Sequence, residues 1–276
     1  MTQTAAPALP HLIDPHSLAA LPRGCGVYIF RGEGTLPLYI GKSVDIRSRV
    51  LAHLRTQEEA EMLAQSRRVD CIETAGEIGA LLLEARLIKQ RHPLYNIRLR
   101  RLRSLCAIEL PHLTGGTPQI VTGKDVAVGQ TDRLYGLFSS VHAAQSKLRE
   151  LADQHRLCLG LLGLEKIGQR GCFGLQVKTC LGACVGTENR QAHDQRLFTA
   201  LVDLKVHAWP FPGAVDLVEQ NGHWVQRHRI HNWRYLGTWC SKHPQHEAHE
   251  AQGFDLDTYK ILVKPIMMNT ARIELA

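Results

Sequence analysis

The chain has 276 residues, with 33 lysines and arginines against 26 acidic residues, a formal net charge of +7 and a pI near 9.1. This length predicts two or three domains, each able to bury a core of its own. The positive charge favours a polyanionic partner without specifying which one. The first residues lack the pattern of a secretory signal and no apolar run has membrane-spanning length, so we expect a cytoplasmic globular protein without membrane contact. In such a chain the eight cysteines are expected to be thiols or metal ligands.

Two short apolar runs near the N-terminus, 27–30 and 38–40, predict a β-hairpin that turns through a glycine-rich segment. If the turn centres on residues 33 and 34 without a bulge, Tyr28 and Tyr39 face each other on adjacent strands. Residues paired in this way are close enough for the two phenols to share one small site. An ordinary hairpin with two half-buried tyrosines fits the same residues.

The segment after the hairpin predicts a helix from Val44 to about Leu54. Ser43 is a suitable N-cap, and the helix dipole favours an acidic residue such as Asp45 in the first turn. The i, i+4 spacing places Arg49 and His53 on one face of this helix. A further helix over 57–66 and a strand over 69–73 are expected to follow.

A long helix is predicted from Glu77 to Arg91, ending before Pro93. Residues 78–88 of this helix are almost wholly apolar, interrupted only by Glu84 and Arg86. The Glu84 carboxylate either belongs to a narrow polar stripe or points into a site. In the second case it is a hard oxygen ligand suited to Mg²⁺.

Seven basic residues and no acidic residue lie between positions 86 and 103. Runs of this kind are usually solvated surface, but their position beside the long helix suits contacts with phosphates. Such contacts supply salt-dependent affinity without sequence choice. The candidate DNA contacts are Lys89, Arg98, Arg100, Arg101 and Arg103.

Several motifs occur in order between positions 22 and 103: Gly-Val-Tyr, Tyr-Ile-Gly-Lys, an arginine in the next helix, Glu-Ile-Gly-Ala-Leu-Leu-Leu-Glu-Ala-Arg-Leu-Ile-Lys, and Pro-Leu-Tyr-Asn. Together they resemble the GIY-YIG nuclease domain of the UvrC excinuclease family. The resemblance implies a three-stranded antiparallel sheet with flanking helices and a metal-dependent endonuclease. The catalytic residues that it implies are Tyr28, Tyr39, Lys42, Arg49, His53, Glu84 and Asn96. His53 departs from the tyrosine common in UvrC, although other GIY-YIG nucleases have a histidine nearby.

These residue types suit the hydrolysis of a phosphodiester bond. Mg²⁺ or Mn²⁺ on Glu84 would act as a Lewis acid on a phosphate or leaving oxygen. Arg49 and Lys42 would offset the charge that develops in the transition state. A phenol with a pKa near 10 is a poor general base unless neighbouring cations or metal-bound water lower that pKa. Tyr39 is the preferred base and Tyr28 the alternative, and the sequence does not decide between them.

Four cysteines, Cys158, Cys172, Cys180 and Cys184, are separated by 13, 7 and 3 residues among several glycines. This spacing predicts loops folded around one zinc or iron–sulfur centre, although four unrelated thiols remain an alternative. The segment resembles the cysteine segment of UvrC, which implies a [4Fe–4S] cluster, with zinc as the runner-up. Cys25, Cys71, Cys106 and Cys240 fit no ligand pattern and are expected to be packing residues.

The last 75 or so residues contain all four tryptophans, at 209, 224, 233 and 239. The runs 215–219 and 224–230 flank Asn221-Gly222, a strong hairpin signal. We therefore predict a small β-rich module whose tryptophans lie in a core or serve as platforms for base stacking. A recurring set, Cys240, His243, His246 and His249, suggests either a metal site or, preferably, a solvated loop or helix.

The expected fold class is α+β, with a nuclease domain over 1–103, a cysteine-rich cluster domain over 104–201 and a β-rich module over 202–276. Both UvrC-like segments in one short chain resemble the small homologues of UvrC. This resemblance implies a nucleotide excision repair endonuclease that cuts damaged double-stranded DNA once, 3′ of the lesion on the damaged strand. It would be directed by a UvrB-type damage-loading subunit, with UvrA upstream. The alternatives are a stand-alone GIY-YIG endonuclease with sequence specificity and a non-catalytic, cluster-bearing DNA-binding module.

Overall fold

The computed structural model describes residues 9–97, 105–112, 115–122, 128–242, 247–248 and 254–276. They form two compact units, one of Met1–Leu102 with Phe211–Ala276 and the other of Arg103–Pro210. The division into three domains at 103 and 201 stays a prediction. Arg98, Arg100, Arg101 and Arg103, predicted to contact DNA, lie outside the described residues, as do His243, His246 and His249.

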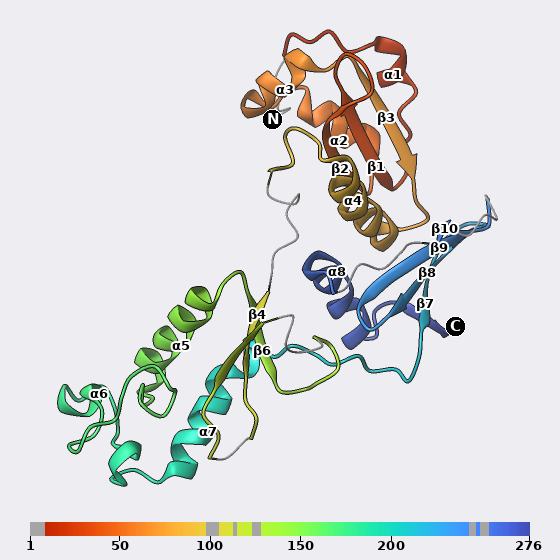
Figure 1. Cartoon of the computed structure of the whole chain (residues 1–276). Helices are drawn as coiled ribbons and strands as arrows, with labels where there is room; N and C mark the ends of the chain where they lie inside the picture. The colour runs from red at the N-terminus through yellow and green to blue at the C-terminus, as the bar shows by residue number, and fades with distance from the viewer. Residues whose placement is uncertain (1–8, 98–104, 113–114, 123–127, 243–246, 249–253) are drawn as a thin grey trace, which may run out of the picture. The chain divides into compact units, whose positions relative to one another are not determined.

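The N-terminal part of the first unit is the predicted three-stranded antiparallel sheet with flanking helices (Figure 1), with strand order β2-β1-β3. Its elements are α1 (Pro15–Ala19), β1 (Gly26–Arg31), β2 (Pro37–Ser43), α2 (Ile46–His53), η1 (Gln57–Glu59), α3 (Ala60–Gln65), β3 (Arg68–Glu73) and α4 (Glu77–Arg91). The bounds of α4 agree with the prediction. Helix α2 begins later than expected, because the Asp45 side chain caps it by accepting from the Ser48 N–H at 2.9 Å.

The two faces of this sheet carry different side chains, since successive residues of a strand point to opposite faces. Val27 and Ile29 of β1 pack with Leu87 and Ile88 of α4. Tyr28 points to the other face, into a core shared with residues of α2 and α3. Strand β1 therefore separates the α4 side of the sheet from the tyrosine side.

The predicted direct pairing of Tyr28 with Tyr39 is wrong. The strand register shifts between Phe30 and Arg31, so that Tyr28 aligns with Gly41 and Phe30 with Tyr39. In this register the two tyrosines are diagonal neighbours on one face, with ring centroids 6.2 Å apart. Gly41 lies beneath the Tyr28 ring, where a Cβ would overlap the phenol oxygen. Glycine at this position lets the buried phenol lie flat against β2.

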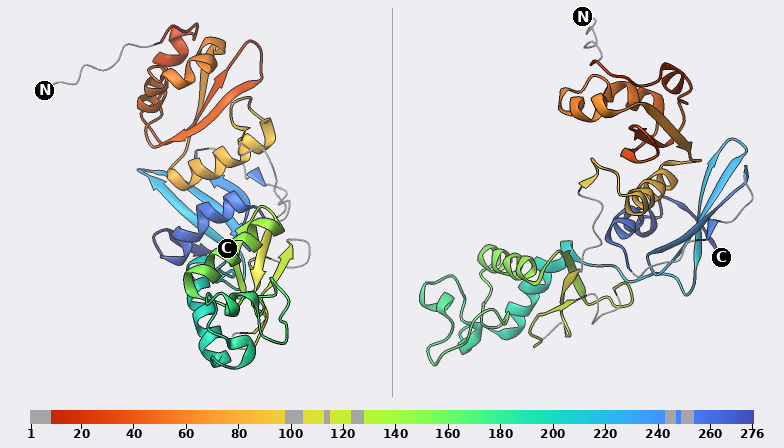
Figure 2. Two further views of the ribbon diagram at one scale, coloured as in Figure 1. Left: turned by 90° about the vertical axis from the view of Figure 1, so that its left-hand side faces the viewer. Right: turned by 45° about the horizontal axis from the view of Figure 1, so that its top comes forward.

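The C-terminal part of the first unit is β-rich, as predicted, and the hairpin of β7 and β8 is present. Its elements are β7 (Val215–Asn221), β8 (Trp224–His231), β9 (Arg234–Cys240), β10 (Glu247–Ala248), α8 (Leu256–Met267) and β11 (Arg272–Leu275). All strand pairs are antiparallel, in the order β10-β9-β8-β7-β11. Trp233 is fully buried, whereas the partly exposed Trp224 ring lies 3.7 Å from Nζ of Lys242. Helix α8 packs on α4, as Figure 2 shows in both views.

The second unit contains a small antiparallel sheet of order β5-β4-β6 with helices packed against it. Its elements are β4 (Cys106–Glu109), β5 (Gln119–Thr122), β6 (Leu134–Phe138), α5 (Val141–His155), α6 (Phe173–Gln176), η3 (Ala183–Val185), α7 (Arg190–Leu201) and η4 (Val202–Leu204). Ile108, Leu148 and Leu197 lie in the core between the sheet, α5 and α7.

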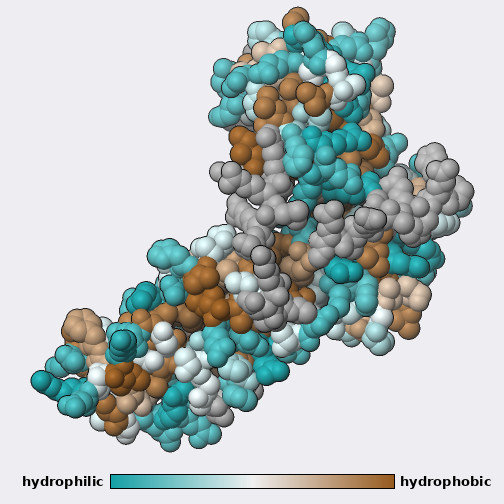
Figure 3. All heavy atoms as spheres, in the orientation of Figure 1, coloured by the Kyte–Doolittle hydropathy of each residue, from teal (hydrophilic) through white to brown (hydrophobic). Residues whose placement is uncertain are grey.

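Figure 3 shows apolar side chains at the surface of this unit near α6, and Phe173 there is 65% exposed. Within the described ranges, no helix is long and apolar enough to cross a membrane.

Candidate functional site

The Tyr28 hydroxyl is the hub of the candidate nuclease site. Its oxygen lies 2.7 Å from Nε2 of His53, and both side chains are almost fully buried. The positive charge of Arg49, one turn earlier on α2, acts on the same hydroxyl and lowers the pKa of Tyr28, against the larger effect of burial. The i, i+4 spacing on α2 therefore brings the predicted arginine and histidine to one phenol.

A carboxylate that the sequence analysis missed completes this group. Nδ1 of His53 pairs with Oε2 of Glu59, which lies in the short helix η1. An ionised carboxylate only accepts hydrogen bonds, so Nδ1 carries the proton and Nε2 accepts from the Tyr28 hydroxyl. An acidic residue in the turn directly after a site helix is the signal that could have indicated Glu59.

The pKa values of these groups are displaced in opposite directions. Burial raises the pKa of Tyr28 and, to a smaller extent, that of Tyr39, because a buried phenolate is poorly hydrated. Burial lowers the pKa of His53 below its usual 6.5, although Glu59 partly opposes this shift. At neutral pH the phenols therefore hold their protons while the imidazole can accept one.

Tyr39 is the more accessible of the two tyrosines. Its side chain is partly exposed, and its ring lies beside that of Tyr28, with centroids 6.2 Å apart. Its ring also lies beside His53, with centroids 5.6 Å apart. Tyr39 is thus positioned to meet a solvent molecule or a substrate, whereas Tyr28 lies behind it.

Two other predicted site residues bind the outer edge of β2, which is an edge strand of the sheet. The Ile40 N–H donates to Oδ1 of Asn96 at 2.9 Å, and Nδ2 of Asn96 donates to the Ile40 carbonyl at 2.8 Å. Two residues further on, the Lys42 N–H donates to Oε1 of Glu84 at 3.1 Å. Asn96 and Glu84 therefore satisfy the outward-facing backbone groups of Ile40 and the N–H of Lys42.

The Glu84 carboxylate lies against β2 and not on an outer polar stripe of α4. Burial raises its pKa, opposed by the Lys42 N–H and the Lys42 charge. Nζ of Lys42 pairs with Oε1 of Glu77 at 2.5 Å, at the rim of the site. A desolvated carboxylate at the edge of a partly open site fits the hard oxygen ligand that Mg²⁺ or Mn²⁺ prefers.

Lys89, predicted to contact DNA, has protein partners. Its ammonium lies 2.5 Å from Oδ1 of Asp255 and 2.7 Å from Oδ2 of Asp257, both near the start of α8. The side chain is 18% exposed. These contacts join α4 to the C-terminal module and occupy the ammonium.

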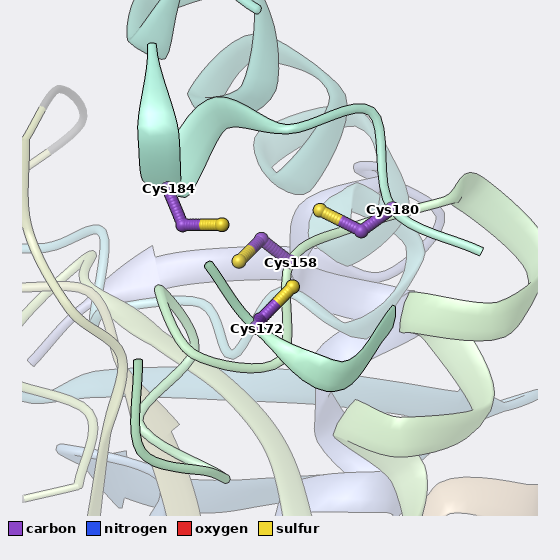
Figure 4. A group of neighbouring side chains, drawn as sticks. All are labelled: Cys158, Cys172, Cys180 and Cys184. Carbon is purple, nitrogen blue, oxygen red and sulfur yellow. The ribbon is translucent and has the colours of Figure 1, made fainter. Parts of the chain in front are cut away.

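The four cysteines predicted to share a centre converge in the second unit (Figure 4). The Sγ atoms of Cys158, Cys172, Cys180 and Cys184 all lie within 4.8 Å of one another. Three of the four residues are buried. Burial raises the pKa of the Cys158 thiol to about 11 and also raises that of Cys172, so that a bound cation is needed to hold them as thiolates. This arrangement fits a metal centre with four thiolate ligands.

The support around this centre is polar and buried. The Cys158 N–H donates to Nε2 of His193 at 3.1 Å, and Nδ1 of His193 lies 3.1 Å from Asp194.

The remaining cysteines are not part of this four-cysteine set. Cys106 is buried in the sheet, and Sγ of Cys240 accepts from the Trp224 indole at 3.1 Å.

Three family models match successive parts of the chain. The UvrC-like GIY-YIG domain matches residues 24–97, the middle domain of the UvrC/Cho excinucleases matches 105–203, and the excinuclease Cho C-terminal domain matches 214–276. The excinuclease Cho of Escherichia coli strain K12 is 50% identical over 256 residues, which are 92% of this chain and 86% of that protein. The chain belongs to the Cho family of excinucleases.

Other Cho and UvrC proteins extend this similarity. Cho of Salmonella typhimurium is 49% identical over 253 residues, which cover 91% of this chain and 85% of that protein. The UvrABC system protein C of Methanothermobacter thermautotrophicus is 33% identical over 69% of this chain and 31% of its own length. The predicted resemblance to the UvrC family, and within it to Cho, is confirmed, and the chain is a GIY-YIG endonuclease of DNA repair.

Among solved structures, the chain is similar to the N-terminal GIY-YIG endonuclease domain of UvrC from Thermotoga maritima, whose crystal structure contains its catalytic magnesium ion. The identity is 34%, over 29% of this chain and 92% of that domain, with a TM-score of 0.27. The Cho-family assignment rests on the sequence relatives and the family models. It decides against a sequence-specific stand-alone nuclease and against a non-catalytic DNA-binding module.

Proposed function

We propose that this Cho-family excinuclease makes one incision 3′ of a lesion, on the damaged strand of duplex DNA, in the cytoplasm. The observation that carries the proposal is the convergence of the predicted catalytic side chains on one edge of one sheet. Tyr28, Arg49 and His53 meet on its tyrosine side, and Glu84 and Asn96 bind its outer strand. Among the described residues we find one such centre, and one centre makes one cut at a time.

The divalent cation is proposed to bind at Glu84. Mg²⁺ or Mn²⁺ bound there supplies a Lewis acid for a phosphate or leaving oxygen. The Lys42 N–H holds Oε1 of that carboxylate, and Asn96 holds the adjoining β2 backbone at Ile40. The ligand is thereby oriented before the substrate arrives, so little reorganisation is needed during the reaction.

Proton removal from the attacking water is proposed to run through both tyrosines. Tyr39 accepts the proton of the water as its own phenol proton moves to the Tyr28 oxygen. The proton of Tyr28 then passes to Nε2 of His53, which becomes an imidazolium paired with the Glu59 carboxylate. This route uses the neutral imidazole as the final acceptor and spares the site a free phenolate, whose formation burial opposes. Tyr39 remains our preferred general base, now with Tyr28 behind it.

Charge on the transition state is proposed to be offset by Arg49 and Lys42. The charge of Arg49 acts on the Tyr28 hydroxyl, as the pKa shifts of both groups indicate, and Lys42 lies at the rim beside Glu77. An anionic phosphate entering between them would compete with Glu77 for the Lys42 ammonium. Charge stabilisation of this kind is commonly the largest single contribution to catalysis.

DNA affinity is proposed to come from Arg98, Arg100, Arg101 and Arg103, because phosphate contacts from a basic segment give affinity without choosing a site. Lys89 is proposed to have a structural role in place of its predicted DNA contact, since Asp255 and Asp257 already bind it. Selectivity for damage is proposed to come from a UvrB-type subunit loaded on the lesion by UvrA.

The cysteine centre is proposed to hold a [4Fe–4S] cluster. Support comes from four convergent thiols and from the resemblance to the cysteine segment of UvrC. A single zinc ion is the second candidate, because tetrahedral Zn–S bonds of about 2.3 Å place the sulfurs roughly 3.8 Å apart, within the compact spacing observed here. Either group would join the loop of Cys172 to the loops of Cys158 and Cys184.

The test is a defined duplex with one bulky adduct, labelled at either end, incubated with this protein in the presence or absence of UvrA and UvrB. We expect one product, cut on the 3′ side of the lesion in the damaged strand, that depends on the loading proteins. Paired cuts that flank the lesion would contradict the single-site proposal. Equal cutting of undamaged duplex without the loading proteins would contradict the partner-directed function.

A further inference from the structure

The first turn of α4 has no side-chain cap of its own, because its N-cap residue is Gly76. The C-terminal module provides the missing acceptors. Oε1 of Glu219, on β7, accepts from the Ile78 N–H at 2.9 Å, and Oε2 accepts from the Gly79 N–H at 2.7 Å. On β8, Oε1 of Gln226 accepts from the Ala75 N–H at 2.8 Å. An external carboxylate thus satisfies two of the amides that every helix leaves unpaired at its start, and its charge suits the positive end of the helix dipole.

Close approach of the module requires glycine in α4. A Cβ on Gly79 would lie 2.8 Å from the His228 ring and 3.0 Å from Oε2 of Glu219. A Cβ on Gly76 would overlap Oε1 of Glu219. Glycine weakens a helix interior, so its presence at Gly79 indicates that contact with the module outweighs helix propensity.

Glu219 is itself held in place. Nε2 of His228 lies 3.1 Å from its Oε2, and Nδ1 of His228 lies 2.7 Å from the Thr238 hydroxyl on β9. The Glu219 side chain is 13% exposed and His228 is 2% exposed. Near the other end of α4, Lys89 is bound by Asp255 and Asp257 of the same module. Helix α4 is therefore attached to the C-terminal module in its first turn and in its last turns.

We propose that the C-terminal module positions the nuclease site, with Glu219 as the positioning residue that orients α4 and, through it, the Glu84 carboxylate. Glu84 lies little more than one turn beyond Gly79 on the same rigid helix. A displaced first turn would move its carboxylate relative to the Lys42 N–H that holds it. This inference rests on the proposed role of Glu84 as the cation ligand, and it assigns a task to a module that lies outside the GIY-YIG motifs.

The first measurement is the affinity of the full-length Glu219→Gln protein for Mn²⁺, determined by electron paramagnetic resonance. Glutamine keeps the shape but loses one acceptor and the charge. We expect Mn²⁺ to bind about tenfold more weakly than in the wild type, because outer residues that orient a ligand commonly affect metal affinity to that extent. Binding of duplex DNA without divalent metal should stay unchanged. Amide hydrogen exchange over 76–83 should become faster, which reports on the helix cap without any activity.

A second variant approaches the same contact from α4. Gly79→Ala raises intrinsic helix propensity while forcing the helix away from His228 and Glu219. It should weaken Mn²⁺ binding as Glu219→Gln does, although simple helix stability would predict the opposite. The matched control is Asp216→Asn, which breaks the pair between Asp216 and Arg229 (2.9 and 3.0 Å) in the same sheet. This control should leave Mn²⁺ affinity and α4 exchange unchanged.

Wild-type Mn²⁺ affinity and unchanged exchange over 76–83 in both Glu219→Gln and Gly79→Ala would overturn the inference. An equal loss of Mn²⁺ affinity in Asp216→Asn would overturn it too, because the effect would then be general destabilisation. Failure of the proposed function looks different. In that case the wild-type protein neither binds Mn²⁺ through Glu84 nor cuts, while exchange over 76–83 still reports whether Glu219 caps α4.

Discussion

The Tyr28 hydroxyl lies 2.7 Å from Nε2 of His53, and the far nitrogen of that imidazole pairs with Glu59. This contact gives a buried phenol a neutral base as its neighbour. The Glu59 carboxylate accepts a hydrogen bond from Nδ1 and thereby gives His53 a defined tautomer. The pairing with Glu59 is what equips it to take up a proton.

The titration of His53 should depend on Glu59. Burial lowers the His53 pKa below 6.5 and Glu59 raises it, so Glu59→Gln should lower it further. Imidazole NMR signals followed against pH measure both values directly. The neutral form is the acceptor, so incision should fall as pH drops through the His53 pKa, and this acid limb should move to lower pH in the variant. An unchanged or raised His53 pKa would contradict the pairing.

The depressed pKa also has a consequence for folding. Between its folded pKa and 6.5, His53 binds a proton in the unfolded chain but not in the folded one. The free energy of unfolding therefore rises with pH across this window, and the contribution is lost as pH falls through it. Urea unfolding of the wild type and His53→Gln at several pH values tests this sign. The difference between the two proteins should change with pH only below about 6.5.

Tyr39→Phe should reduce the rate of single-turnover incision more than Tyr28→Phe. Tyr39 is partly exposed and is proposed to meet the water, whereas Tyr28 relays a proton from behind. We expect a loss of about 100-fold or more for Tyr39→Phe, the scale of general acid–base catalysis. DNA affinity without metal serves as the control and should be unchanged in both. A larger loss in Tyr28→Phe would reverse the assignment of the base.

Glu84→Gln should abolish incision while leaving DNA binding nearly intact. The substitution keeps the shape of the side chain and a hydrogen-bond acceptor for the Lys42 N–H, but it removes the charge that binds the cation. A loss of at least about 100-fold at saturating DNA is expected for an electrostatic contribution of this kind. Glu150→Gln, which changes a surface carboxylate on α5, is the matched control. Wild-type rates in Glu84→Gln with Mg²⁺ present would exclude Glu84 as the ligand.

Cys172→Ser and Cys184→Ser should lose the metal of the second unit and destabilise it. Anaerobically prepared wild type is expected to be brown, with iron near four per chain and a broad absorption around 400 nm for a [4Fe–4S] cluster. Cys71→Ser, outside the four-cysteine set, should keep both metal and colour. Stoichiometric zinc without iron would identify the other cofactor. Thermal unfolding should shift in the two ligand variants because metal binding and folding are coupled.

Local patterns in the sequence determined a large part of this fold. Helix α4 runs from Glu77 to Arg91, as its apolar run and the following Pro93 predict, and the hairpin of β7 and β8 follows from Asn221-Gly222. The spacing of Arg49 and His53 placed them on one helical face, and the four cysteines converge as their clustering suggested. Such features depend on residues that are close in sequence, because helix and strand geometry determine which of their side chains lie on the same face.

Other features were decided only by tertiary structure. The register of β1 and β2, which shifts at a bulge after Phe30, aligns Tyr28 with Gly41, so that the two tyrosines are a diagonal pair and not the expected direct one. Glu59 lies in the site because the chain turns after α2 and returns to His53. Lys89 forms ion pairs with Asp255 and Asp257 near the start of α8. Glu219 caps α4 although it lies 140 positions after Gly79 in the sequence, a contact that no local propensity encodes. Contacts of this kind arise when packed elements bring unpaired amides and buried charges to the partners nearest in space.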